Sequence, residues 1–294
     1  MKKTILFAIA VLALASCSKQ EGLTDDCSDE IRFNITMPDG GRMKSATKAT
    51  ATSFQSGDAV SLYAVEYAGQ TPMPLQVGGN FLNNEKLTYN GSAWQAARTL
   101  YWSESACDFY ALYPYQPSIG SIEKYPFSLN ANQDGQGYEE SDLLFAKAEA
   151  VSRTDGSVNL QFRHMMSKCR VVVEKGEKFE GDIPDDIVCH IYNTMVDCMV
   201  DLEAGSVEKN PFGVKKTITM KKLSNSEFEA VLVPQNLEKR TPLIELTMGG
   251  IAYLLETSLS FRPGYVHTLT VTLNTSPDQE MIEININPDV DDWN

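Results

Sequence analysis

The sequence predicts an all-β protein built from antiparallel β-sandwiches. Hydrophobic and polar residues alternate in short segments, for example 31–37, 158–162 and 266–273, and this period of two indicates strands with one buried face. Turn-forming pairs such as Asn90-Gly91 separate the segments, and helical periodicity is scarce. Strands that are joined by turns, without intervening helices, form antiparallel sheets that stack as sandwiches.

The first residues have the order of a bacterial export signal. Two lysines precede an apolar stretch at 5–14, which is too short to span a bilayer because a span takes about 20 apolar residues. Leu-Ala-Ser then directly precedes Cys17, which is the pattern of lipoprotein cleavage and lipid attachment. We therefore expect a signal peptide at 1–16, a lipid anchor at Cys17 and a polar tether at 17–29. The alternative is an ordinary secretory signal in which Cys17 is incidental.

Length and charge limit the number of domains and the class of partner. The rest of the chain has the length of two domains of about 100–200 residues each. The polar stretch near 151–157 predicts a boundary between an N-terminal sandwich at 30–153 and a C-terminal sandwich at 154–294. The formal net charge of −14 argues against nucleic acid, because phosphate binding requires clustered Lys and Arg.

The sequence contains no recognisable catalytic or metal-binding motif. The three histidines lie in β-patterned segments without metal-ligand spacing, and nucleophile elbows, phosphate loops and dinucleotide fingerprints are absent. We interpret His164 as a strand residue whose ring hydrogen-bonds locally. The acidic segment 287–292 lacks the spacing of a calcium loop and is interpreted as a solvated end. We predict that the chain is not an enzyme and binds neither cofactor nor metal.

Two cysteines are candidates for a disulfide. If Asn193-Thr194 forms a two-residue hairpin loop, Cys189 and Cys198 face each other at a non-hydrogen-bonded position, where Cα atoms lie about 4.5 Å apart. Asn-Thr is a weak hairpin turn, so free thiols in a looser loop are the alternative.

An aromatic-rich stretch runs from Trp94 to Tyr115 and includes Tyr101 and Trp102. One interpretation is an exposed platform for glycans, because flat rings stack on sugar faces. The other is core packing, since aromatic residues favour strands and fill sandwich cores. The strand spacing of these residues favours the core.

Several short motifs occur along the chain in a characteristic order. They are Phe54-Gln55-Ser56-Gly57-Asp58; Trp94 followed by Thr99-Leu100-Tyr101-Trp102; Asp108-Phe109-Tyr110-Ala111 with Tyr113-Pro114-Tyr115; Asp142-Leu143-Leu144-Phe145-Ala146; Leu160, Phe162 and His164 with Ser167-Lys168; Val233-Pro234-Gln235; and Phe261 with Pro263-Gly264. Together they resemble the fimbrillin family, the subunits of type V pili in Bacteroidales, from about residue 30 to the end. The resemblance implies two tandem transthyretin-like antiparallel β-sandwich domains. It also implies lipoprotein export to the outer membrane and polymerisation with other pilus subunits into a cell-surface fimbrium.

The resemblance further implies maturation by proteolysis. In that family a protease of trypsin-like preference cuts after a basic residue in the loop behind the first strand, and a strand of a neighbouring subunit fills the groove that is left. Here the predicted first strand at 31–37 is followed by three basic candidates, Arg42, Lys44 and Lys48, of which Arg42 is the first choice. Loss of a paired strand leaves an open backbone edge and apolar surface, which together favour strand addition.

The C-terminal segment 281–287 is a candidate donor strand, because Ile282, Ile284 and Ile286 alternate with polar residues. The alternative is that this segment completes its own domain. We hypothesise a structural pilus subunit or pilus-associated adhesin, with a surface receptor on a host or bacterial cell as a further candidate partner. The lack of one unambiguous arginine site leaves open an anchor or tip subunit that keeps its lipid. The rival hypothesis is a monomeric, surface-anchored glycan-binding lipoprotein that uses the aromatic residues near Trp102.

Overall fold

The computed structural model describes residues 29–37, 53–274 and 284–293. The predicted signal peptide, Cys17, the cut-site candidates Arg42, Lys44 and Lys48, and Ile282 lie outside these residues. Strands dominate, and the described helices are the short α1 (Gln136–Ser141) and the 3-10 helix η1 (Arg153–Asp155). Within the described ranges, no helix has the length and hydropathy needed to cross a membrane. The all-β prediction is confirmed.

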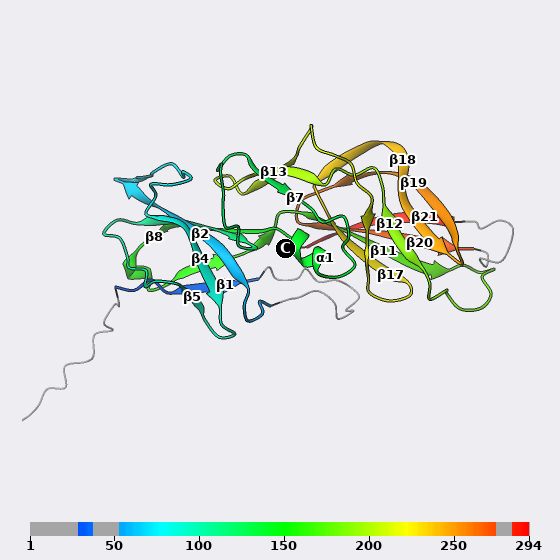
Figure 1. Ribbon diagram of the computed structural model, residues 1–294, viewed down its shortest axis with the longest axis horizontal. Helices are drawn as coiled ribbons and strands as arrows, with labels where there is room; N and C mark the ends of the chain where they lie inside the picture. Colours follow the sequence, from blue (N-terminus) through cyan, green and yellow to red (C-terminus); the bar gives the residue numbers. More distant parts are fainter. Residues whose placement is uncertain (1–28, 38–52, 275–283, 294) are drawn as a thin grey trace, which may run out of the picture.

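A seven-stranded antiparallel sheet organises the N-terminal part of the molecule (Figure 1). Its strands, in spatial order, are β10 (Arg163–His164), β8 (Leu144–Val151), β6 (Cys107–Tyr113), β2 (Ala59–Ala68), β4 (Leu82–Tyr89) and β5 (Trp94–Ala96), with β3 (Thr71–Pro72) paired to β2. A separate two-stranded sheet contains β1 (Phe33–Thr36) and β9 (Val158–Gln161), which run parallel.

The central strands of the seven-stranded sheet are buried on both faces. Leu62 of β2 and Phe109 of β6 pack into one apolar core together with β1 and β9. Their neighbours Tyr63 and Tyr110 point the other way, into a second core that continues into the C-terminal part. The sequences of these strands are therefore nearly continuous runs of apolar residues, because both faces of each strand lie against other parts of the protein. Most of the aromatic stretch packs in cores, as its strand spacing predicted.

Two sheets form a sandwich in the C-terminal part. The five-stranded sheet has the order β16 (Lys221–Lys222), β17 (Glu227–Leu232), β11 (Ser167–Lys175), β20 (Tyr265–Leu273) and β21 (Ile284–Asp292). The four-stranded sheet has the order β15 (Ile218–Thr219), β12 (Val188–Ile191), β18 (Gln235–Met248) and β19 (Ile251–Phe261). Val171 and Leu269 of the first sheet and Leu246 of the second belong to one buried cluster. Since β11 and β20 pair in parallel, as β1 and β9 do, the fold is not purely antiparallel.

A three-stranded sheet of β14 (Ser206–Lys209), β13 (Asp197–Asp201) and β7 (Tyr125–Ser128) connects the two parts. The boundary predicted between 153 and 154 does not divide the sheets. β7 precedes it but pairs with β13, whereas β9 and β10 follow it but pair with β1 and β8. The polar stretch near 151–157 instead connects β8 to β9, and both of these strands belong to the N-terminal part. The sheets cross the predicted boundary because strands that pair here lie far apart in the sequence.

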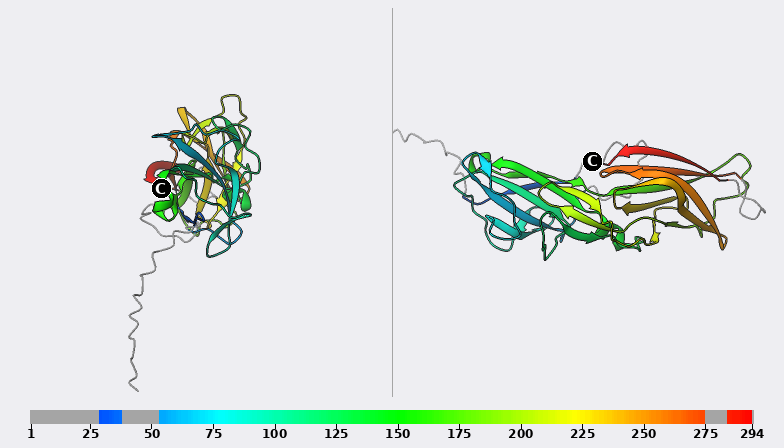
Figure 2. Two further views of the ribbon diagram at one scale, coloured as in Figure 1. Left: turned by 90° about the vertical axis from the view of Figure 1, so that its left-hand side faces the viewer. Right: turned by 90° about the horizontal axis from the view of Figure 1, so that it is seen from above.

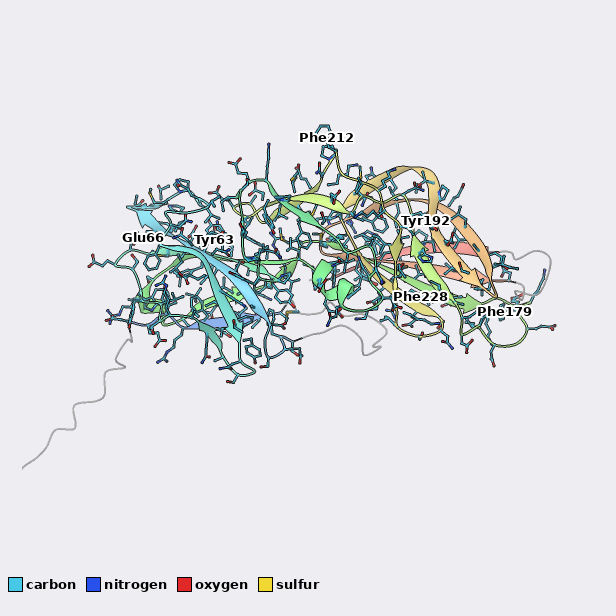
Figure 3. The ribbon with its side chains drawn as sticks, viewed as in Figure 1. Tyr63, Glu66, Phe179, Tyr192, Phe212 and Phe228 are labelled. Carbon is cyan, nitrogen blue, oxygen red and sulfur yellow. The ribbon has the colours of Figure 1, made fainter. Side chains whose placement is uncertain are left out.

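The molecule is elongated, and both of its terminal strands run toward its middle. β1 starts at the outer end of the N-terminal part, and β21 starts at the opposite outer end (Figures 1 and 2). Tyr63 lies among the side chains of the N-terminal part and Phe228 among those of the C-terminal sandwich, whereas Phe212, 94% exposed, projects from the surface (Figure 3).

Candidate functional site

β1 lies at the edge of its sheet. Within the described part of the chain, β9 is the only strand that pairs with it, along Phe33–Thr36. On its other side the preceding residues make two backbone hydrogen bonds: the Ile31 N–H donates to the Leu100 carbonyl and the Trp102 N–H donates to the Asp29 carbonyl, each at 2.8 Å. β1 can leave without breaking the pairing of the larger sheets, but its loss takes from β9 the one strand partner that β9 has among the described residues.

The inward face of β1 covers an apolar groove. Ile31 is 5% exposed and Ile35 is 8% exposed, and the ring centre of Phe33 lies 6.2 Å from that of the buried Phe109. The predicted alternation of this segment is therefore confirmed for these residues. Each isoleucine contributes about 1.5–3 kcal/mol by burial. Loss of the strand would uncover this groove and the free backbone edge of β9.

β21 is the second edge strand. It pairs along its length with β20, from Ile284 opposite Leu273 to Asp292 opposite Tyr265, and with no other strand of the described chain. Two of the donor candidates, Ile284 and Ile286, lie in this strand. In this structure the C-terminal segment thus completes its own sheet, which is the alternative that the sequence left open. As an edge strand, it is held by a single neighbour.

Trp293 directly follows β21 and is buried between the two parts of the molecule. Its side chain is 4% exposed, and its backbone N–H donates to the Gly264 carbonyl at 2.9 Å. The indole stacks on the His164 ring, with 3.6 Å between ring centres and 11° between planes. The Lys168 ammonium lies 4.4 Å from the indole centre on a cation–π contact. His164, Lys168 and Gly264 all belong to the motifs that resemble the fimbrillin family.

Lys168 is a buried charge of a kind that sequence patterning does not reveal. Its side chain is 0% exposed, its ammonium lies 3.8 Å from the Glu229 carboxylate, and it has no hydrogen-bond partner. Burial lowers the pKa of Lys168, opposed by the nearby Glu229 charge. The hydroxyl of Tyr138, from α1, donates to Glu229 at 3.1 Å, and burial raises the pKa of Tyr138 well above its usual value. The Lys168 ammonium and the Tyr138 hydroxyl both stabilise the negative charge of the Glu229 carboxylate.

His164 and His267 both make hydrogen bonds inside the fold. The Nδ1 atom of His164 lies 2.8 Å from Asp142 Oδ1, so the predicted local hydrogen bond is confirmed. His267 is 1% exposed and its Nε2 accepts the Arg262 N–H at 3.0 Å, while burial lowers the pKa of His267 to about 4. Within residues 29–37, 53–274 and 284–293, no three His, Cys, Asp or Glu side chains are grouped as for a metal ion.

The candidate disulfide between Cys189 and Cys198 is absent, and both residues are free thiols. Cys189 lies in β12 opposite Leu246, whereas Cys198 lies in β13 of a different sheet. Asn193, at φ 62°, lies where the chain passes from one of these sheets to the other, so the two strands do not form a hairpin. Burial raises the pKa of Cys198 to about 12 and that of Cys189 well above its usual value, so neither is a thiolate near neutral pH.

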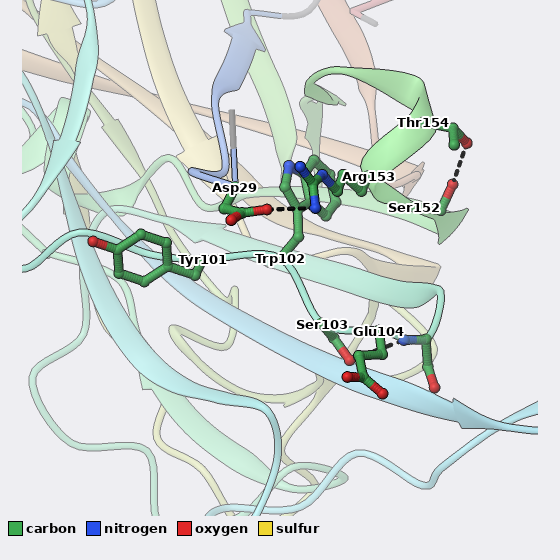
Figure 4. Close-up of a pocket in the computed structure, with 9 residues that line it drawn as sticks. Asp29, Tyr101, Trp102, Ser103, Glu104, Ser152, Arg153 and Thr154 are labelled. Atoms are coloured by element: carbon green, nitrogen blue, oxygen red, sulfur yellow. Dashed lines mark hydrogen bonds and ion pairs between the residues drawn. The ribbon is translucent and has the colours of Figure 1, made fainter. Parts of the chain in front are cut away.

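A pocket of about 650 Å³ opens at the outer end of the N-terminal part (Figure 4). Its lining residues are Asp29, Tyr101, Trp102, Ser103, Glu104, Ser105, Ser152, Arg153 and Thr154. Tyr101 is 60% exposed, which is the exception to core packing in the aromatic stretch. Arg153 pairs with Asp29 at 2.5 Å, so the residue that precedes β1 forms part of the wall.

Comparisons with known proteins identify the family of this chain. A family profile described as "Fimbrillin-like" matches residues 47–293. The chain belongs to the fimbrillin-like family. This is a family of fimbrial and adhesion proteins rather than of enzymes, and its members are found in cell-surface fimbriae.

Individual relatives share less than a third of their residues with this chain over the aligned regions. A candidate fimbrium tip subunit of Bacteroides ovatus, Fim1C, is 28% identical over 192 residues, which are 57% of this chain and 34% of that protein. The chain thus spans about a third of the length of that relative. A crystal structure of a candidate cell adhesion protein of Bacteroides uniformis has a TM-score of 0.66 at 22% identity and covers 90% of this chain and 100% of that chain. Another from B. ovatus has a TM-score of 0.70 at 15% identity, with 90% and 97% covered. These two structures show a shared fold.

Proposed function

We propose that this member of the fimbrillin-like family is a pilus subunit or pilus-associated adhesin that is assembled by strand exchange. It is exported as a lipoprotein anchored through Cys17 and cut after Arg42, Lys44 or Lys48, so that β1 is lost. The C-terminal strand of a second copy, with Ile282, Ile284 and Ile286, then takes the place of β1. The observation that carries the proposal is that β1 and β21 are both edge strands with one neighbour each.

Their polarity supports a head-to-tail assembly. Ile284 lies opposite Leu273 at the outer end of the C-terminal part, so a β21 that separates from β20 extends away from that end. β1 starts at the opposite end of the molecule and runs inward (Figure 2), so the place that it would vacate has the same direction. A strand entering it from outside runs in the direction of β1, parallel to β9. Such a contact between unlike surfaces does not close on itself and produces a filament.

Limited trypsin treatment of the full chain without its lipid is expected to convert monomers into a ladder of polymers. The physical reason is that the uncovered groove and the β9 edge provide a template for an added strand. Gel filtration and electron microscopy measure the polymers, and mass spectrometry of the cut protein gives the new N-terminus. Residue Met43, Ser45 or Ala49 at that position identifies the site.

Two variants control this experiment. A chain with Arg42→Ala, Lys44→Ala and Lys48→Ala keeps β1 and is expected to remain monomeric. A chain that ends at Asn274 lacks the donor and is expected to be cut without polymerising, but to cap the ends of polymers of the intact chain. Polymers that form equally well without residues 275–294 contradict the strand-exchange proposal.

The pocket beside Tyr101 supports a second candidate function, binding of a saccharide by the uncut monomer. An exposed aromatic ring above a wall of hydroxyl and charged groups has the composition of a sugar site. Tyr101→Ala is expected to weaken binding on a glycan array by about tenfold or more, because the ring supplies the apolar contact. Phe212→Ala is the matched control, since Phe212 is exposed but lies outside the pocket. No glycan binding, or equal binding by both variants, rules out this site.

A further inference from the structure

The end of β21 leads into one buried side chain. Residues 288–292 are all exposed, and the apolar Val290 among them is 37% exposed. Trp293, which follows directly, is 4% exposed. Along residues 288–293, the indole of Trp293 is therefore the side chain that is buried against the rest of the molecule.

The surroundings of this indole are built by separate elements. His164 in β10 is positioned by Asp142 at 2.8 Å, and Lys168 lies in β11, which is paired on both sides by β17 and β20. Gly264, at φ 72° in the turn between β19 and β20, presents its carbonyl to the Trp293 N–H. We call His164, Lys168 and the Gly264 carbonyl the indole seat. Because none of its parts belongs to β21, the seat stays in place when the strand leaves.

Lys168 makes the indole seat selective for an aromatic side chain. Its buried ammonium has the Glu229 carboxylate on one side at 3.8 Å and the indole face on another at 4.4 Å, with no hydrogen bond to either. The negative face of an aromatic ring stabilises a desolvated cation, which an aliphatic side chain of equal volume does not. The Tyr138 ring is more distant, at 6.0 Å, so withdrawal of the indole leaves this charge without its nearest aromatic neighbour.

We propose that the indole seat is a binding site for the C-terminal tryptophan that holds β21 in its own chain and so sets how readily the strand passes to a second copy. This inference rests on the proposed role of β21 as donor. Trp293 and β21 are one continuous segment, so the strand cannot leave β20 completely while the indole stays bound. The seat thus keeps a subunit closed until a neighbour's groove competes for the strand.

Hydrogen exchange of the full chain tests the binding site. Trp293→Ala is expected to speed amide exchange in β20 and β21 by about tenfold or more, while Val290→Ala, a change at an exposed apolar residue of the same strand, alters it by less than about twofold. Trp293→Phe should remain closer to the wild type than Trp293→Leu, because phenylalanine keeps a ring face above Lys168. Free indole added to Trp293→Ala should slow the exchange again.

Equal exchange in Trp293→Ala and Val290→Ala overturns the proposal, as does wild-type exchange in Trp293→Leu. Polymerisation after limited trypsin separates this inference from the proposed function. Trp293→Ala is expected to polymerise with an initial rate about tenfold higher than the wild type, since opening of the strand is faster. Absence of polymers in the cut wild type refutes the donor role while leaving the exchange result intact. Polymers in the cut wild type together with unchanged exchange in Trp293→Ala refute the seat alone.

Discussion

Replacement of Glu229 by glutamine is expected to lower the free energy of unfolding by about 3–5 kcal/mol at neutral pH. Glutamine keeps the size of the side chain and can still accept the Tyr138 hydroxyl, so the change removes little besides the charge. That charge compensates the ammonium of Lys168, which lies 3.8 Å away in a side chain that is 0% exposed. Urea unfolding followed by fluorescence measures the loss.

The loss of unfolding free energy in Glu229→Gln should become smaller as the pH rises. Burial holds the pKa of Lys168 below its usual value, and removal of Glu229 takes away the larger of the two carboxylate charges, Glu229 and Asp142, that raise it. The folded variant therefore releases the lysine proton at a lower pH than the unfolded chain does. Since the unfolded state then binds more protons than the folded state, stability increases with pH up to the unfolded-state pKa. Urea unfolding of the wild type and of Glu229→Gln at neutral pH and at about pH 9.5 measures this change, and the difference in unfolding free energy between the two proteins should be smaller at the higher pH.

Two further variants serve as controls for the Glu229→Gln result. The triple change Lys168→Met, Glu229→Leu and Tyr138→Phe removes both charges of the pair together with the hydroxyl that donates to Glu229, and it is expected to be neutral or to stabilise by about 1–4 kcal/mol, because no member of this buried polar group is left without its partner. Glu85→Gln breaks the pair with Arg98, whose side chain is 59% exposed, and should cost less than about 1 kcal/mol. A cost for Glu229→Gln as small as that for Glu85→Gln contradicts a buried pair.

Phe109→Ala is expected to lower the free energy of unfolding by about 3–5 kcal/mol. Phe109 is 0% exposed in β6, and the rings of Phe33 and Trp102 each contact it edge-on at 6.2 Å between centres. The cavity removes the surface on which Phe33 of β1 rests. We therefore also expect faster amide exchange in β1 and faster cleavage in the segment that follows it.

Phe228→Ala is the matched control for this second effect. Phe228 is 1% exposed and lies in β17, in the core of the C-terminal sandwich. Its loss should destabilise the chain by a similar amount, about 3–5 kcal/mol, without a specific effect on β1. Equal acceleration of β1 exchange in both variants would mean that β1 opens with the whole molecule and is not released locally.

The sequence predicted the strands best where one face of a strand is solvated. Segment 158–162 and segment 266–273 alternate, and both contain a strand of the structure, β9 and β20. The same reasoning carries less information for β2 and β6, because alternate side chains there enter two different apolar cores. Hydrophobic pattern reports burial, and a strand buried on both faces has no polar face to mark its period.

Long-range pairing explains why the sheets do not follow the predicted boundary and why the candidate disulfide, to which free thiols were the alternative, is not formed. A domain boundary between 153 and 154 and a hairpin disulfide between Cys189 and Cys198 both assume that neighbours in sequence are neighbours in a sheet. β7 instead pairs with β13, and β12 and β13 lie in different sheets. No local signal specifies such partners, since a strand edge has the same backbone groups whichever strand it meets.

The all-β class, the positions of many strands and the resemblance to fimbrillins could be predicted from the residues alone, because they follow from local alternation, turn residues and short motifs. The edge positions of β1 and β21 and the contacts of Trp293 with His164 and Lys168 became visible in the folded molecule. An edge, and a lysine buried among groups from several strands, are properties of contacts between segments that are distant in the sequence. Those contacts exist once the sheets have packed.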